Sequence, residues 1–199
     1  MHASPSLNLL TDSGSSPWQI LVATILSLRT RDEVTVSASR RLFAVAPDPT
    51  SLRALSEERI ATLIFPAGFY KTKAKNLLRI AHQLEDQDDQ VPRVREQLLQ
   101  LPGVGRKTAN LVLNLAFGIE AICVDTHVHR IPNRLGWINT STPEESEMAL
   151  EALWPRKHWI EANALLVSFG QATCTPLGPR CSICAFREHC PRKGVQTSR

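Results

Sequence analysis

The sequence of 199 residues has no run of about 18 consecutive apolar residues, so no segment is long enough to cross a membrane as a helix. Its first residues, Met-His-Ala-Ser-Pro, lack the basic start and compact apolar core of a secretory signal peptide. We therefore expect a cytoplasmic protein, nucleoid-associated if it is bacterial. Residues 1–15 are rich in serine, proline and glycine, which predicts a loose arm.

Strand patterns are also missing, because no segment sustains the alternation of apolar and polar residues typical of a half-buried strand. Apolar residues recur at helical spacing instead, which predicts an all-α fold. We expect Pro47 and Pro49 to stop the second helix, Gly170 to close the last one, and Pro132 to end or kink the helix that Asp125 caps. The expected helices span residues 18–28, 32–45, 57–64, 71–84, 94–100, 106–117, 125–129, 143–154 and 158–169.

The nucleotide-binding fingerprints fail at the one glycine-rich stretch that resembles them, residues 101–110. A Rossmann fingerprint needs a third glycine where Thr108 stands, and a Walker loop needs a glycine where Arg106 stands. Two glycines between two helices instead predict a helix-hairpin-helix, in which the amides of Gly103-Val104-Gly105 and Arg106 bind a nucleic-acid phosphate at a helix start. The alternative is an ordinary turn between two helices.

Lys107 lies in the first turn of the helix that follows this hairpin, beside Arg106. A lysine amine at this position is a candidate nucleophile, and a simple phosphate contact is the equally weighted alternative. Asp125 precedes His127 in the stretch Val-Asp-Thr-His, where a helix cap is the favoured interpretation of an isolated aspartate. If this segment packs beside the hairpin, its carboxylate and the Lys107 amine form a catalytic pair.

Cysteine is scarce, with five in the chain, and an odd number without an export signal argues against a disulfide framework. Four of the five, Cys174, Cys181, Cys184 and Cys190, are separated by six, two and five residues. Thiolates at such spacings bind metal, either a tetrahedral zinc ion or a [4Fe–4S] cluster, and the spacing alone leaves both open. Cys123 lies in an apolar run and is expected in the core.

Taken in order, the hairpin with Lys107, the Val-Asp-Thr-His stretch and the four cysteines closely resemble the endonuclease III family of DNA glycosylase/AP lyases. The resemblance runs from Ser16 to about Pro191. It implies a six-helix domain over residues 17–122, a second domain of residues 1–16 and 123–199 around a [4Fe–4S] cluster, and a DNA-binding cleft between them. It also implies that Lys107 attacks C1′ of a flipped-out oxidised pyrimidine nucleotide, assisted by Asp125, and nicks the strand by β-elimination.

The same resemblance places further residues near DNA. Thr108 and His127 would lie near the abasic sugar, and Arg180 would meet phosphates. Phe69 aligns with a residue that fills the gap left by the flipped base, and Arg29 would contact the estranged base or its phosphate. Core packing is the alternative for Phe69. The implied partner is double-stranded DNA with damaged pyrimidines or abasic sites, bound by a monomer and without a membrane. The alternative functions are a mismatch-specific thymine or uracil glycosylase and a catalytically silent DNA-binding or redox-sensing iron–sulfur protein.

Overall fold

The computed structural model describes residues 14–199, so most of the expected arm lies outside the described residues. Every regular element in this part of the chain is a helix, which confirms the all-α prediction. The chain divides into two compact units, which we call the N-terminal unit (residues 14–119) and the C-terminal unit (residues 120–199). Among the described residues, no helix has both the length and the apolar character needed to span a membrane.

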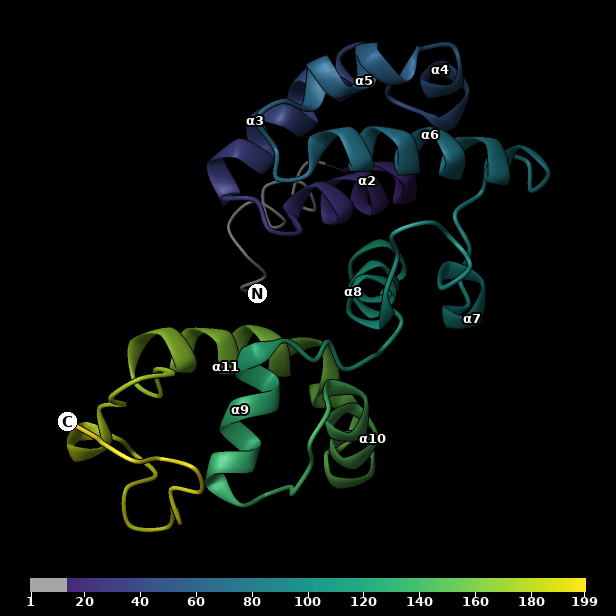
Figure 1. The fold of residues 1–199 in the computed structure, drawn as a ribbon. Coiled ribbons are helices and arrows are strands. Elements are labelled where there is room, and N and C mark those ends of the chain that lie inside the picture. Colours follow the sequence, from purple (N-terminus) through teal and green to yellow (C-terminus); the bar gives the residue numbers. More distant parts are fainter. Residues whose placement is uncertain (1–13) are drawn as a thin grey trace. The chain divides into compact units, whose positions relative to one another are not determined.

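The N-terminal unit is organised around α2 (Pro17–Ser27), whose Leu21, Val22 and Leu26 are fully buried. Ser16 begins this helix with a capping box, as its sequence predicts. Helix α2 packs against α3, α6 and α8, and Figure 1 shows α6 running alongside it. The other helices of this unit are α3 (Asp32–Phe43), α4 (Pro49–Arg53), α5 (Glu57–Ile64), α6 (Tyr70–Glu85), α7 (Arg95–Leu98) and α8 (Arg106–Phe117).

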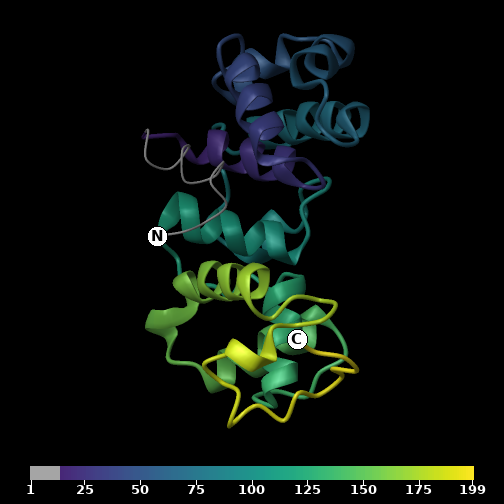
Figure 2. The same cartoon turned by 90° about the vertical axis from the view of Figure 1, so that its left-hand side faces the viewer.

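The C-terminal unit has a smaller core around α9, which packs against α10 and α11. Beyond α11 the chain continues mainly as loops, drawn in yellow in Figure 2, with one short helical turn. Its helices are α9 (Thr126–Leu135), α10 (Pro143–Leu153), η1 (Arg156–His158), α11 (Trp159–Ala172) and η2 (Cys181–Ile183).

The expected effects of proline and glycine on helix ends are confirmed only in part. Pro49 opens the short helix α4 behind the Asp48 cap, because proline lacks only an N–H that the first helical position leaves unused. Helix α9 runs past Pro132 to Leu135, so Pro132 does not end the helix, and the expected kink stays a prediction. Helix α11 runs past Gly170 to Ala172, so the expected helix end at Gly170 is wrong. The reason for Gly170 is tertiary packing, described below.

Candidate functional site

The hairpin between α7 and α8 uses its two glycines differently. Gly103 has φ +81°, which residues with a side chain rarely adopt, and a Cβ there would lie 2.7 Å from Asn76 Nδ2. Val104 is buried, and its N–H donates to Leu101 O at 3.1 Å. This turn uses the Val104 amide, which corrects the expectation that it is open to a phosphate.

Gly105 has no such internal reason to be glycine. It is the exposed N-cap of α8 with φ −95°, and a Cβ there would meet no atom within 4 Å. Lys107 is exposed in the first turn of the same helix, whereas Thr108 is buried at 3% exposure. The hairpin therefore presents an open backbone position and a lysine amine on one helix start, and DNA contact by Thr108 stays a prediction.

Asp125 begins α9 in the C-terminal unit and uses one carboxylate oxygen as the cap. Its Oδ1 accepts from the backbone N–H of His127 at 2.8 Å and of Val128 at 2.9 Å. Within residues 14–199 its Oδ2 makes no hydrogen bond. The cap interpretation is thus correct for Oδ1, and a catalytic role for Asp125 stays a prediction.

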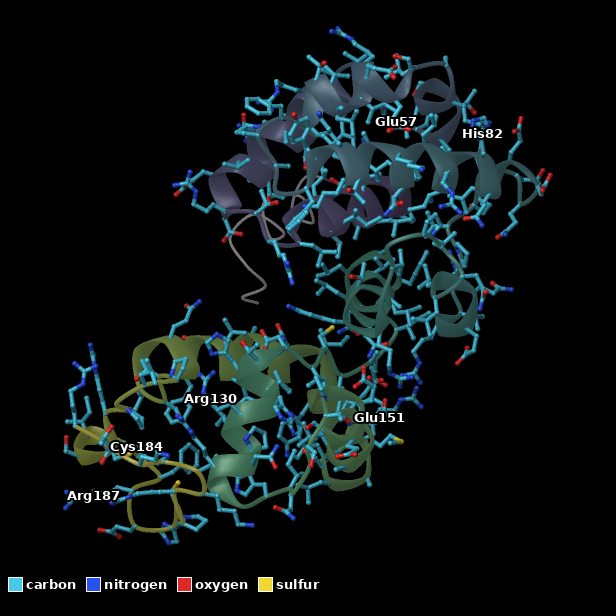
Figure 3. The ribbon with its side chains drawn as sticks, viewed as in Figure 1. Glu57, His82, Arg130, Glu151, Cys184 and Arg187 are labelled. Atoms are coloured by element: carbon cyan, nitrogen blue, oxygen red, sulfur yellow. The ribbon has the colours of Figure 1, made fainter. Side chains whose placement is uncertain are left out.

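His127 is held where α9 and α11 approach closely. Its Nδ1 lies 3.1 Å from Arg130 Nη2, and Arg130 Nη2 also donates to the carbonyl of Cys174 at 2.8 Å. A Cβ on Gly170 would lie 2.1 Å from His127 Nδ1 and 3.0 Å from Arg130 Nη2. Gly170 is glycine because this contact leaves no room for a side chain. Figure 3 shows Arg130 within the unit, whereas Arg187 lies at the edge of the C-terminal loops.

Replacing Gly170 with alanine is expected to displace the His127 ring and lower the free energy of unfolding by about 1–3 kcal/mol, the usual cost of overpacking. Urea unfolding monitored by circular dichroism measures this change. Gly105→Ala is the matched control, because its Cβ enters open space, and its unfolding curve should stay close to that of the wild type. Equal curves for Gly170→Ala and the wild type would contradict the packing argument.

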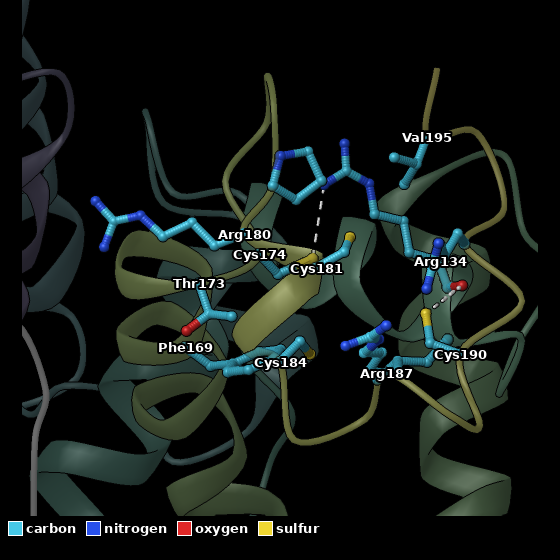
Figure 4. Close-up of a pocket in the computed structure, with 13 residues that line it drawn as sticks. Arg134, Phe169, Thr173, Cys174, Arg180, Cys181, Cys184, Arg187, Cys190 and Val195 are labelled. Carbon is cyan, nitrogen blue, oxygen red and sulfur yellow. Dashed lines mark hydrogen bonds between the residues drawn. The ribbon is translucent and has the colours of Figure 1, made fainter. Parts of the chain in front are cut away.

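The four cysteines of the C-terminal loops line one cavity that is open in part to solvent. All four are half-buried, and Figure 4 shows them among the residues that line the cavity. Cys123 is buried at 1% exposure, which confirms that it belongs to the core. No three His, Cys, Asp or Glu side chains of residues 14–199 converge as ligands of a single metal ion. Four thiols around one cavity are a donor set suited to either a zinc ion or an iron–sulfur cluster.

Positively charged side chains surround this cavity. Arg134 Nη1 lies 3.6 Å from Cys174 Sγ and donates to Thr175 O at 2.7 Å, and the Cys190 thiol approaches Arg134 O at 3.5 Å. Figure 4 marks the two contacts of Arg134 with sulfur as dashed lines. Arg187 and Arg192 also line the cavity. These guanidinium groups suit a bound group of net negative charge. Arg180 is exposed and its side chain extends away from the sulfur atoms, so it is accessible to an external anion.

Phe69 and Arg29 lie together on the N-terminal unit. Phe69 is 63% exposed, so the core-packing alternative is wrong. The Arg29 guanidinium carbon lies 5.4 Å from the centroid of the Phe69 ring, a cation–π distance. Both residues have positive φ, +52° and +56°, although neither is glycine.

The sequence patterns described above do not predict a role for Lys73. It projects from α6 and is buried at 6% exposure, and its Nζ donates to Leu26 O, Leu28 O and Thr30 Oγ1 at 2.8, 2.6 and 3.0 Å. The signal that could have found it is its register, because Lys73 falls four residues before Leu77 on the apolar face of the helix. Burial lowers the pKa of the Lys73 amine to about 8.

This pKa predicts a pH dependence of stability. Between about pH 8 and the ordinary lysine value of 10.5, the unfolded chain binds the Lys73 proton more often than the folded chain does. The contribution of Lys73 to the free energy of unfolding should therefore rise with pH across this window and stay level below it. Urea unfolding of the wild type and Lys73→Met from pH 7 to 10.5 measures the difference, and Lys75→Met, which makes the same change at an exposed position of α6, is the matched control. If the difference in the free energy of unfolding between the wild type and Lys73→Met does not change with pH, the lowered pKa is contradicted.

Comparison with known proteins agrees with the fold and the motifs. Residues 22–156 match the family described as HhH-GPD superfamily base excision DNA repair protein. Endonuclease III of Thermotoga maritima is 46% identical over 88% of this chain and 83% of that protein. Endonuclease III homolog 2, chloroplastic, of Arabidopsis thaliana is 44% identical over 89% of this chain, which spans 49% of that longer protein.

Solved structures give the same result. A trapped endonuclease III–DNA covalent intermediate with an estranged adenine matches with a TM-score of 0.82 and 31% identity, covering 96% of this chain and 97% of that one. A thermostable thymine-DNA glycosylase matches with a TM-score of 0.79 and 26% identity, covering 94% and 93%. The resemblance that the ordered motifs indicated is confirmed. The chain belongs to the endonuclease III family within the HhH-GPD superfamily of base excision DNA repair proteins.

Proposed function

We propose that this chain, a DNA glycosylase/AP lyase of base excision repair, acts as a monomer on oxidised pyrimidines in double-stranded DNA, with Lys107 as its nucleophile. The Lys107 amine forms a bond to C1′ as the glycosidic bond breaks and the damaged base leaves. The sugar ring then opens to an imine on Lys107. Loss of a C2′ proton and of the 3′ phosphate from this imine nicks the strand.

The observation that carries the proposal is the start of α8. Gly105 is glycine at a position where the fold would accept a side chain, so its bare backbone fits the close approach of an external strand. Lys107, two residues on, is exposed in the same helical turn. A phosphate bound at this helix start would bring the adjoining sugar within reach of the amine.

Asp125 is proposed as the assisting carboxylate. Its Oδ1 caps α9, while Oδ2 makes no hydrogen bond within the described residues. A carboxylate with one oxygen fixed and one available can stabilise positive charge that develops on the sugar and accept a proton from the attacking amine.

Cys174, Cys181, Cys184 and Cys190 are proposed to hold a [4Fe–4S] cluster. The donor set fits, because four half-buried thiols line a cavity that guanidinium groups surround. When bound, such a cluster is a redox centre whose iron–thiolate bonds cross-link the C-terminal loops. In this chain Arg134 orients the site by contacting the Cys174 sulfur and the following carbonyl.

Purified protein is therefore expected to be brown, with broad visible absorption and about four iron atoms per chain. Cys184→Ser should lower the iron content severalfold, whereas Cys123→Ala, which changes a cysteine outside the cavity, should retain it. Metal analysis and the absorption spectrum measure both. Colourless protein that contains zinc would overturn the cluster assignment.

The proposed activity is tested by borohydride trapping on duplexes that contain thymine glycol, an abasic site, or a thymine or uracil mismatch. Covalent adducts with thymine glycol and with the abasic site are the expected result. Activity restricted to mismatches would select the second candidate, a thymine or uracil glycosylase, which the match to the thymine-DNA glycosylase structure favours. Tight binding without any product would select the catalytically silent alternative.

A further inference from the structure

Two loops of the N-terminal unit are locked together at the surface that carries Arg29 and Phe69. The Gly68 amide donates to Thr30 Oγ1 at 3.0 Å. A Cβ on Gly68 would lie 2.3 Å from the backbone oxygen of Arg29, so the two backbones touch directly. The loop after α2 and the loop before α6 are therefore joined by a hydrogen bond and by direct backbone contact.

The buried Lys73 amine forms hydrogen bonds to the loop after α2 at this junction. Its three hydrogen bonds to Leu26 O, Leu28 O and Thr30 Oγ1 saturate an ammonium group, which has three donors. All three acceptors are neutral, so the buried charge is held by the turn itself and not by an ion pair. Thr30 Oγ1 accepts from both Lys73 and Gly68, which makes this hydroxyl the link between the lysine and both loops.

Arg29 lies next to Thr30 on one loop, and Phe69 lies next to Gly68 on the other. Arg29 and Phe69 both have left-handed backbone conformations, which residues with side chains adopt only where the surroundings enforce them. Their side chains meet in a cation–π contact, and the ring remains 63% exposed. An exposed aromatic ring capped by a guanidinium group on a fixed backbone can stack between base pairs while the cation meets the neighbouring strand.

We propose that Lys73 is a positioning residue that holds Arg29 and Phe69 as one preformed unit, which enters the base stack when a damaged nucleotide is extruded. This inference rests on the proposed glycosylase function. Lys73 acts on extrusion from the duplex and not on the chemistry at the sugar. Its loss therefore slows reactions that need a base pair to be opened and spares those on an already accessible sugar.

The test compares Lys73→Met with Lys75→Met, which makes the same change at an exposed position of the same helix. Single-turnover excision of thymine glycol from duplex DNA should fall by about 10- to 100-fold for Lys73→Met, because fixed groups have moved from their working positions. Borohydride trapping on a single-stranded abasic oligonucleotide should stay within about twofold of the wild type for both variants, since no pair must be opened there. A 2-aminopurine base beside the lesion reports unstacking by fluorescence and should respond less to Lys73→Met.

A double-mutant cycle separates positioning from a general structural role. If Lys73 acts through the ring, Lys73→Met should cost far less in a Phe69→Ala background than in the wild type. Thr30→Val removes the shared hydroxyl, and Thr30→Ser keeps it. The first should reproduce the Lys73→Met defect in milder form, and the second should not. Should Lys73→Met fail to fold, the threonine pair supplies the test.

Unchanged duplex excision by folded Lys73→Met, additive effects in the cycle, or an equal loss on duplex and single-stranded substrates would each overturn the positioning role. Failure of the proposed function looks different, because then the wild type itself forms no adduct with either DNA.

Discussion

Replacing Lys107 with arginine is expected to eliminate the borohydride-trapped adduct and to lower strand cleavage at an abasic site by about 1,000-fold or more, since the nucleophile itself is lost. Arginine keeps the positive charge at the start of α8 but cannot form an imine with the sugar. DNA binding, measured by fluorescence anisotropy with an abasic duplex, should change by less than about tenfold, because the phosphate contact remains.

This substitution separates the two interpretations of Lys107. A lysine that only contacts phosphate would tolerate arginine, so a Lys107→Arg protein with normal cleavage would exclude the nucleophile role. Lys75→Arg is the matched control, because Lys75 is an exposed helical lysine of the same unit. It should retain full trapping and cleavage.

Asp125→Asn is expected to lower base excision by about 100- to 10,000-fold, the range for loss of a general acid–base group. Stability should hardly change, because asparagine caps a helix about as well as aspartate and keeps an Oδ1 acceptor for the His127 and Val128 amides. Excision under single-turnover conditions and urea unfolding measure the two effects on the same preparation.

Asp48 supplies the control for this charge change. Its Oδ1 caps α4 by accepting from the Ser51 amide at 2.8 Å, so Asp48→Asn makes the same change at a cap with no proposed chemistry. Normal excision by both variants would mean that Asp125 is only a cap. Loss of excision by Asp125→Asn alone would assign a role to its charge.

The features that could be predicted from sequence are local along the chain. The capping box at Ser16, the start of α8 and the cap at Asp125 are each decided by residues within three or four positions of one another. The grouping of the four cysteines can be predicted for the same reason, because residues separated by so few positions must lie close together, and they line one cavity.

The features that were missed depend on residues distant in sequence. The hydrogen-bond acceptors of Lys73 lie 43 to 47 positions before it, so the residues next to Lys73 in the sequence do not predict them. Gly170 was expected at a helix end, whereas its requirement comes from His127 on another helix. A glycine indicates either a backbone conformation or a close approach, and only the packed neighbours distinguish these causes.

The two glycines of the hairpin are glycine for different reasons, one related to the fold and the other to what binds there. Gly103 is favoured by its own positive φ and by the nearness of Asn76, both of which belong to the fold. Gly105 is under no such constraint from the fold, because a Cβ at this position meets no atom within 4 Å. Selection can act on Gly105 only through what binds there. In a descendant that no longer bound DNA, residue 105 would be free to change without any effect on folding.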